Sequence, residues 1–213
     1  EILRCLVGSE MCIRDRTITS QLSGTYNSAM IGRDMALEED PNKKIHVIDS
    51  KSAGAGTTII VRKLQEYIGK GMNFQEIVDH ITKYCETVKT YFILESMDNL
   101  IKNGRVSALA GKLAGILGIK ILGQASSEGT IELLRKLRGK DMIYKKTVED
   151  MFSSGYNGGK DIISHCFNEE RVKYVSEMIK AKYPEAEIEV MLTGGLCSYY
   201  AEEKGLIIAF EVK

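Results

Sequence analysis

The segment from Ser20 to Ala29 carries the residues best suited to chemistry. It reads Ser-Gln-Leu-Ser-Gly-Thr-Tyr-Asn-Ser-Ala, and its small hydroxyl side chains are Ser20, Ser23, Thr25 and Ser28. Apolar Ile18 and Leu22 are typical of a strand end, and the stretch after Gly24 is typical of a helix. Free backbone N–H groups and the positive end of a helix dipole at such a turn attract an anion. Ser23 also has the chemistry of an N-cap, so a capped helix without a ligand is the alternative interpretation.

Alternating helices and strands must position this segment. The first half of the chain predicts β–α–β–α–β order, which is typical of a largely parallel sheet. Asn73, followed three residues later by Glu76, predicts a capping box at the start of one helix. The expected elements are helices over residues 24–39, 54–69, 74–87 and 107–117, strands over 45–48 and 90–94, and a helical turn over 98–102.

The second half of the chain has a different pattern. Ser127-Glu-Gly129 is a good hairpin turn between two predicted strands. The expected strands cover residues 119–126, 130–137, 161–166, 187–192 and 205–212, and the expected helices cover 139–153 and 168–183. We therefore predict an α/β protein of two domains: a parallel-sheet α/β domain over residues 17–118 and a smaller α+β domain over 119–213, with the boundary near Gly118.

Composition excludes several classes of partner. Twenty-nine acidic residues balance twenty-nine basic ones, so nothing favours nucleic acid or an anionic membrane surface. Five cysteines at irregular spacing form no CxxC pair or Cys/His cluster, which argues against a metal site and for reduced thiols in the cytoplasm. No apolar run is long enough for a spanning helix, so we do not expect an integral membrane protein.

Four segments, in order, resemble the DegV family of bacterial fatty-acid-binding proteins. The first is the segment from Ser20 to Ala29. The others are Val47-Ile-Asp-Ser-Lys51 with Gly54 and Gly56; Leu100-Ile-Lys-Asn-Gly-Arg-Val-Ser107 running on to Leu117-Gly-Ile-Lys120; and Gly129-Thr-Ile with Lys136-Leu-Arg-Gly139. The similarity covers residues 17–213. It implies the same two-domain layout, with a ligand held in the cleft between the domains.

The resemblance also implies a function and a site. It implies a protein that is not an enzyme, that has no cofactor, and that holds a long-chain fatty acid for phosphorylation by a separate fatty acid kinase. The Ser of the Leu-Ser-Gly-Thr motif, Ser23, would hydrogen-bond the carboxylate of the fatty acid. The head-group residues expected around it are Ser20, Gly24, Thr25 and Arg105.

Arg105 follows the turn Asn103-Gly104, where the family pattern usually has two glycines. Asn tolerates the left-handed conformation better than other non-glycine residues, so the turn itself is retained. The resemblance implies that Arg105 is either a fixed cation near the head group or a docking residue for the kinase. The alternative is an exposed arginine paired with Asp98 or Glu95.

The C-terminal region departs from the family pattern. Many members have a His-x-Gly-Pro-Gly segment before the last strand, and Ala201 stands at the His position of this chain. Three nearby side chains are candidates to donate the missing hydrogen bond: Ser198, Tyr199 and Tyr200. Glu202 would repel a carboxylate.

A stretch rich in small and apolar residues is the candidate lining of an acyl tunnel. Its candidates are Leu109, Leu113, Ile116 and Leu117. Burying each methylene of an acyl tail gains about 0.8 kcal/mol, so the tail would dominate the affinity. The alternative interpretation is an ordinary filled core, because sequence alone does not separate a core from a cavity.

Residues 1–16 do not match the family, which has a further stretch before residue 17. The string Leu6-Val-Gly-Ser-Glu-Met-Cys-Ile-Arg-Asp-Arg16 reads as a conceptual translation of a common sequencing adapter. We therefore expect a non-native leader and a first domain that is incomplete at its N-terminus.

An enzyme that uses the Ser23-Gly24-Thr25 helix start as an anion cradle, for phosphotransfer or hydrolysis, is the alternative function. Against it, the sequence has no Gly-x-x-x-x-Gly-Lys-(Ser/Thr) loop, no metal-carboxylate cluster and no plausible Ser/His/Asp set. The three histidines, His46, His80 and His165, are interpreted as ordinary strand or helix residues. Cys197 is interpreted as an inert thiol rather than a nucleophile.

Overall fold

The computed structural model describes residues 5–7, 12–106, 119–139 and 141–213. The helices are α1 (Thr25–Glu39), α2 (Ala55–Gly69), α3 (Phe74–Thr87), α4 (Asp98–Lys102), α6 (Met142–Ser153), α7 (Glu169–Lys182) and α8 (Gly195–Ala201). The strands are β1 (Cys5–Val7), β2 (Cys12–Thr17), β3 (Lys44–Asp49), β4 (Val88–Leu94), β5 (Lys120–Ala125), β6 (Ile131–Leu137), β7 (Tyr156–His165), β8 (Glu187–Leu192) and β9 (Leu206–Val212). The predicted mixed α/β architecture is confirmed.

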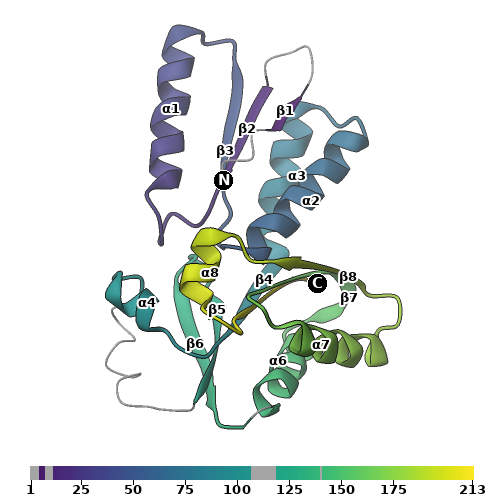
Figure 1. Cartoon of the computed structure of the whole chain (residues 1–213). Helices are drawn as coiled ribbons and strands as arrows, with labels where there is room; N and C mark the ends of the chain where they lie inside the picture. Colours follow the sequence, from purple (N-terminus) through teal and green to yellow (C-terminus); the bar gives the residue numbers. More distant parts are fainter. Residues whose placement is uncertain (1–4, 8–11, 107–118, 140) are drawn as a thin grey trace.

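The first sheet has the order β1-β2-β3 and lies between α1 and α3 (Figure 1). β2 and β3 are parallel, as expected for two strands joined by a crossover helix, and β1 pairs with β2 antiparallel. Residues 12–16 form most of β2, whereas the sequence predicts a non-native leader over residues 1–16. Whether residues 1–16 belong to the native protein stays a prediction.

The second sheet has the order β6-β5-β4-β9-β7-β8, and it corrects one sequence prediction. The sequence predicts that the strand over residues 90–94 belongs to the first, parallel sheet. As β4 it instead pairs antiparallel with both β5 and β9 in the second sheet. Apolar alternation identifies a strand but does not say which neighbour will satisfy its backbone groups. The first domain is therefore not a three-strand parallel unit with β4 as its third strand.

Most other helices and strands lie where the local sequence pattern predicts them. The capping box is present: the Asn73 side chain accepts from the backbone N–H of Glu76, whose carboxylate accepts from the backbone N–H of Asn73. The hairpin turn closes through Gly129, which has φ +83° and whose N–H donates to the Ser126 carbonyl. α8 was not predicted from the sequence. The predicted helix over 107–117 and the boundary near Gly118 lie outside the described residues, so the domain limits stay a prediction.

The two faces of the six-stranded sheet pack differently. One face, here called the α6 face, is covered by α6 and α7, and Ile163, Ile208 and Phe210 are fully buried there. The other face, here called the α2 face, packs Ile162 and Ala209 against α2 and α3. The pair of helices α2 and α3 thereby joins the two sheets, because α2 packs on β7 and β9 while α3 contacts β3. Figure 1 shows α4 and α8 beside the junction between the two sheets.

Candidate functional site

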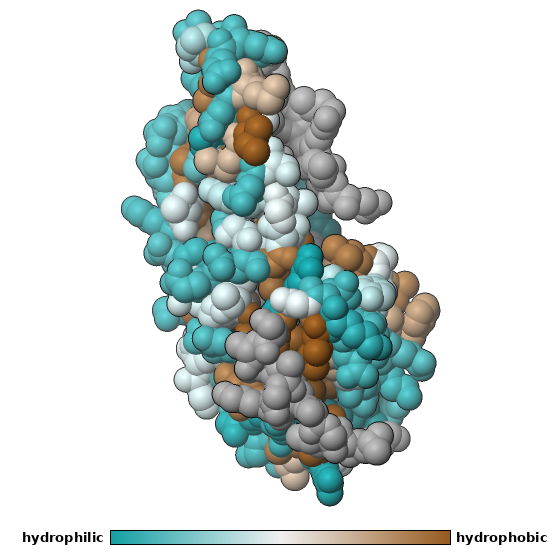
Figure 2. Space-filling model, turned by 90° about the vertical axis from the view of Figure 1, so that its left-hand side faces the viewer, coloured by the Kyte–Doolittle hydropathy of each residue, from teal (hydrophilic) through white to brown (hydrophobic). Residues whose placement is uncertain are grey.

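A central pocket of about 220 Å³ lies on the α2 face, where the six-stranded sheet meets the turn after β2. Figure 2 shows apolar surface, in brown, in the hollow between the two parts of the molecule. Its apolar lining residues are Ile18, Leu22, Ala53, Phe92, Leu94, Leu100, Ala125, Ile131, Leu196, Ala201 and Ile207. Its polar lining residues are Thr19, Ser23, Ser52, Thr90, Arg105, Thr130, Cys197 and Tyr200, and Gly129 completes it.

The strand period decides which β4 side chains reach this pocket. Thr90, Phe92 and Leu94 point to the α2 face and line it, whereas Tyr91 and Ile93 point into the core of the α6 face. Because Thr90 and Phe92 lie opposite Ala209 and Ile207 in the ladder, β9 contributes to the same face. The floor of the pocket is therefore part of the sheet surface.

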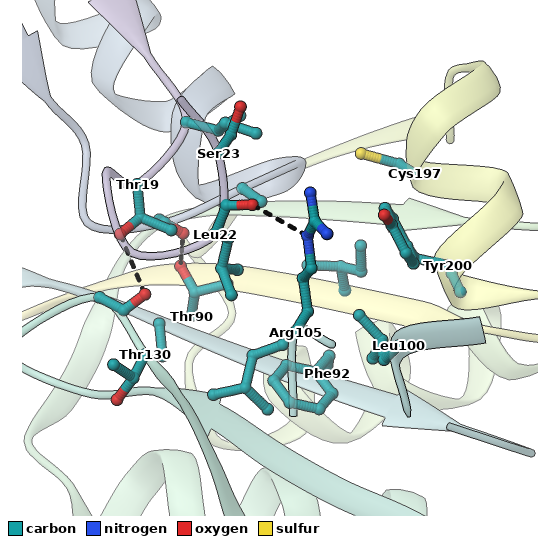
Figure 3. Close-up of a pocket in the computed structure, with 18 of the residues that line it drawn as sticks. Thr19, Leu22, Ser23, Thr90, Phe92, Leu100, Arg105, Thr130, Cys197 and Tyr200 are labelled. Atoms are coloured by element: carbon teal, nitrogen blue, oxygen red, sulfur yellow. Dashed lines mark hydrogen bonds between the residues drawn. The ribbon is translucent and has the colours of Figure 1, made fainter. Parts of the chain in front are cut away.

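Five serine and threonine side chains line the pocket and are here called the hydroxyl cluster: Thr19, Ser23, Ser52, Thr90 and Thr130. Ser52 Oγ donates to Thr90 Oγ1 at 2.8 Å, and both residues are buried. Thr19 Oγ1 donates to the Gly129 carbonyl at 3.0 Å, which ties the turn after β2 to the β5–β6 hairpin (Figure 3). Buried hydroxyls need such partners, so these bonds fix the side chains of Thr19, Ser52 and Thr90.

Ser23 is not the N-cap of α1, which corrects the sequence prediction. The N-cap is Gly24, one residue later, and it makes no side-chain cap hydrogen bond. Ser23 Oγ instead accepts from the backbone N–H of Thr25 at 3.2 Å and from Thr25 Oγ1 at 3.0 Å. With both lone pairs engaged, the Ser23 hydroxyl proton is free to donate. Ser23 is therefore a hydrogen-bond donor directed by its neighbour and suited to an anion.

Arg105 is the one charged side chain among the described lining residues. Its Nε donates to the Leu22 carbonyl at 3.2 Å, and its Nη1 donates to the Asn103 carbonyl. The pairing with Asp98 or Glu95 is not found: Glu95 forms an ion pair with Lys120. Figure 3 shows the guanidinium at the side of the pocket where Ser23 and Cys197 lie. Arg105 thus bridges the turn after β2 and the turn after α4, and leaves other N–H donors for a ligand.

The three candidate residues on α8 have different surroundings. Tyr200 lines the pocket. Ser198 Oγ is instead bonded to Thr193, at 2.7 Å from its Oγ1 and 3.1 Å from its carbonyl oxygen. Tyr199 is exposed, and its hydroxyl accepts from Asn103 Nδ2 at 3.1 Å. Of the three residues, Tyr200 is therefore the one placed to reach a ligand. Ala201 also lines the pocket, whereas Glu202 does not.

Cys197 lines the same pocket, a place that the sequence did not reveal. Burial raises the pKa of its thiol, although a hydrogen bond from the Gly54 backbone acts in the opposite direction. A raised pKa favours the thiol over the nucleophilic thiolate at neutral pH. The interpretation of Cys197 as an inert thiol therefore agrees with its surroundings.

The remaining sequence candidates lie outside the pocket. Ser20 donates its backbone N–H to the Asp49 carboxylate at 3.2 Å, and neither Ser20, Gly24 nor Thr25 belongs to the lining. Thr25 still acts on the site, through Ser23. The tunnel candidates lie outside the described residues; they are Leu109, Leu113, Ile116 and Leu117.

Sequence reasoning missed most of the hydroxyl cluster. Thr19, Ser52, Thr90 and Thr130 come from four separate segments that only the fold brings together. One signal was present: Thr90 is a polar residue on an otherwise apolar face of its strand. A hydroxyl at such a position needs a polar partner or a ligand, but the sequence does not say which.

The histidines lie away from the pocket. His165 is buried, and its Nδ1 accepts from the backbone N–H of Asn168 at 3.1 Å. His80 is exposed on α3, and its ring packs edge-on against Tyr67. Burial and nearby Arg33 lower the pKa of His46. No imidazole or carboxylate side chain therefore stands among the described lining residues to act as a base.

The chain matches a protein-family model described as "Uncharacterised protein, DegV family" over residues 16–213. It is 43% identical over 196 residues to a DegV domain-containing protein of Streptococcus pneumoniae, a match that covers 92% of this chain and 70% of that protein. A DegV domain-containing protein of Streptococcus gordonii is 44% identical over the same shares of the two chains.

Solved structures with the same fold hold fatty acids. The Streptococcus pneumoniae Fatty Acid Kinase (Fak) B3 protein loaded with linoleic acid has a TM-score of 0.92 and 42% identity, covering 96% of this chain and 73% of its own. A DegV family protein from Eubacterium eligens loaded with heptadecanoic acid has a TM-score of 0.90 and 43% identity, covering 97% and 75%. The corresponding values for a Ruminococcus gnavus protein refined with vaccenic acid are 0.86, 37%, 93% and 72%.

Proposed function

The chain belongs to the DegV family, and from this premise and the pocket we propose that it binds a long-chain fatty acid. The observation that carries the proposal is the pairing of two kinds of surface in one pocket. A directed hydroxyl donor, Ser23, and the guanidinium of Arg105 stand at one side, and the rest of the lining is mainly apolar. This combination fits an amphiphile with an anionic head.

The proposed orientation follows from the charges. The carboxylate accepts from the Ser23 hydroxyl and from free N–H groups of Arg105, with Tyr200 as a further donor. The tail lies along the sheet surface formed by Phe92, Leu94 and their neighbours. Each buried methylene contributes about 0.8 kcal/mol, whereas a hydrogen bond to a charged group contributes roughly 1.5–3 kcal/mol. The tail therefore sets most of the affinity, and the head group sets the direction.

Similar proteins support this reading. Three solved structures of 37–43% identity carry linoleic, heptadecanoic or vaccenic acid. Those ligands share a carboxylate and a long hydrocarbon tail, and they differ in length and in the number of double bonds. The shared chemistry is the one that the pocket of this chain fits.

We propose further that the protein presents the carboxylate to a separate fatty acid kinase and catalyses nothing alone. Phosphoryl transfer needs phosphate positioning and a divalent metal. Across the described part of the chain, no group of three or more His, Cys, Asp or Glu side chains is arranged to hold a metal ion. The described lining also offers no imidazole or carboxylate to activate a hydroxyl or a water, so a hydrolase built on Ser23 has no base.

The partner and the location complete the proposal. Arg105 is exposed beside the pocket, so the kinase contacts it when the carboxylate is phosphorylated. A cytoplasmic location supplies the ATP, and it agrees with the thiols of Cys166 and Cys197, which form no disulfide. None of the helices that the structure describes is long and apolar enough to cross a membrane.

Native mass spectrometry of the protein purified from bacteria tests the central claim. We expect a co-purifying species with the mass of a long-chain fatty acid, and rebinding of oleate after its removal. With a DegV-associated kinase and ATP, the loaded protein should yield an acyl phosphate. A bound nucleotide, or turnover of ATP by the protein alone, would contradict the proposal.

A further inference from the structure

Phe92 occupies an unusual position on the pocket floor. It stands on β4 directly opposite Gly123 of β5 in the antiparallel ladder. A Cβ added at Gly123 would overlap the Cζ and Cε2 atoms of the Phe92 ring. Side chains of such a pair usually stand up from the sheet with their Cβ atoms about 5 Å apart. The Phe92 ring therefore leans across the strand and covers the bare backbone of Gly123, an arrangement known from glycine–aromatic pairs in sheets.

The leaning ring affects the pocket above it. Phe92 lines the pocket, whereas Gly123, which the ring covers, does not. Next along the same face of β5, Ala125 also lines the pocket with a small side chain. The space over β4 and β5 thus exists because Gly123 lets the ring lie low. A larger residue at position 123 would force the ring upwards into that space.

We propose that the Phe92–Gly123 pair sets the cross-section of the acyl pocket and thereby selects fatty acids by shape. The inference rests on the proposed fatty-acid binding and goes beyond it by naming what decides between tails of equal length. A saturated tail is slim, and each cis double bond adds a bend that sweeps a wider path. The height of the ring determines how well a bent tail fits relative to a straight one.

Linoleate and stearate are suitable probes, because both have the same carboxylate and the same chain length. Phe92→Leu removes the ring while keeping an apolar side chain at the floor. The wider pocket relieves bent tails and loses contact with slim ones. We expect the ratio of linoleate to stearate affinity to rise by about tenfold, the scale on which apolar pockets discriminate by about one methylene.

Phe152→Leu is the matched control. Phe152 is a half-buried aromatic residue on α6, packed on the α6 face and outside the pocket lining. It loses the same atoms as Phe92→Leu, so it reports any general effect of a weakened core. Its affinity ratio should equal that of the wild type. An unchanged ratio in Phe92→Leu, with both acids still bound, would overturn the proposal.

Gly123→Ala makes the opposite change, because the new methyl displaces the ring into the pocket. It should lower the linoleate to stearate ratio. The methyl also comes within 2.8 Å of the Glu132 carbonyl oxygen, so the variant strains the β5–β6 ladder as well. The double variant Phe92→Leu/Gly123→Ala carries the same strain but has no ring to displace.

The double variant should therefore have the ratio of Phe92→Leu alone. If Gly123→Ala lowers the ratio to the same extent with and without the ring, backbone strain is the cause and the proposal is wrong. Failure of the proposed function gives a different result: the wild type would then bind neither stearate nor linoleate.

Discussion

The two faces of the six-stranded sheet are built from the same strands, but one is a closed core and the other contains a pocket. On the α6 face, α6 and α7 close over Tyr91, Ile208 and Phe210 and leave them buried. On the α2 face, the part over β4 and β5 meets the turn after β2 and the short α8, and a pocket remains. Neighbouring residues of β4 thus serve packing and binding in turn. The difference lies in what covers each face, because strand composition is apolar on both.

The two faces also carry different kinds of buried polar side chain. On the α2 face, Ser52 and Thr90, two of the buried members of the hydroxyl cluster, are bonded to each other. The α6 face carries Asp161, a fully buried carboxyl that accepts from the Tyr156 hydroxyl at 2.6 Å. Its other carboxyl oxygen has no hydrogen-bond partner among the described residues. The α2 face has such an atom as well: Ser164 lies opposite Ile207 in the ladder, and its buried hydroxyl oxygen has no hydrogen-bond partner among the described residues. Each face therefore carries a buried polar side chain that is incompletely satisfied.

Truncation of two adjacent residues of β9, one on each face, should give the largest difference between the faces. Ile208→Ala opens a cavity in the α6-face core, so we expect it to lower the free energy of unfolding by about 2–5 kcal/mol. Ile207→Ala should cost less, because that side chain already borders a hollow. It should weaken fatty-acid binding more than Ile208→Ala does. Urea unfolding and fatty-acid titration measure the two effects, and equal stability losses would show that the faces are packed alike.

On the α6 face, Asp161 should make the stability of the protein depend on pH. Burial raises the pKa of Asp161 to about 7 from its ordinary value of 3.8, and the hydrogen bond from Tyr156 only partly opposes this. Because the folded protein holds this proton more tightly than the unfolded chain, the contribution of Asp161 to stability is greatest below pH 3.8. It declines up to about pH 7 and is level above that.

Asp161→Asn should remove this slope, because the amide keeps the shape and does not titrate. At pH 8 we expect the variant to be more stable than the wild type by roughly 2–4 kcal/mol, from about 1.4 kcal/mol for each pKa unit. Chemical denaturation between pH 4 and pH 8 measures it. Glu211, which also raises the pKa of Asp161, is the residue to vary next if a slope persists.

Ser23→Ala tests the pocket face without disturbing the core. It removes one hydrogen bond to a charged group, so fatty-acid binding should weaken by roughly tenfold, from about 1.5 kcal/mol. Stability should change little, because the hydrogen bond that Ser23 Oγ accepts from the Thr25 backbone N–H is exposed and water can replace it. Thr25→Val is a useful companion: it keeps the Ser23 hydroxyl but removes one of its donors. A lower melting temperature with unchanged affinity would return Ser23 to a purely structural role.

Thr90→Val should have the smallest effect. It keeps the shape of the side chain and removes the acceptor of the Ser52 hydroxyl, so we expect a loss of about 1 kcal/mol in stability. A double-mutant cycle with Ser52→Ala isolates the bond. Coupling near zero would mean that a ligand or water, rather than the partner residue, satisfies these hydroxyls.

Prediction from sequence succeeded where the physics is local. The capping box at Asn73 and Glu76 needs only the backbone and two side chains, so α3 begins where the sequence placed it. The hairpin at Gly129 needs one residue with positive φ. At Ser23 the local prediction was out by one position, because α1 begins at Thr25 and Gly24 is its N-cap.

The site was only partly predictable. Ser23, Arg105 and Tyr200 line the pocket and were all candidates. Ser198 and Tyr199 were equally plausible on residue type, and the fold engages their hydroxyls with Thr193 and Asn103 instead. Nothing in residue type or spacing foretells such competition, because the competing partners come from other elements.

The family, most of the order of helices and strands, and a hydroxyl-rich turn suited to an anion follow from the sequence alone. Each of these follows from short-range patterns: side-chain period, caps and motif spacing. Only the tertiary structure shows that β4 belongs to the second sheet and that Thr19 hydrogen-bonds a carbonyl oxygen 110 residues away. It also decided that Phe92 leans over Gly123. A strand's period tells which face a side chain takes, but what lies opposite that face depends on contacts between distant parts of the chain.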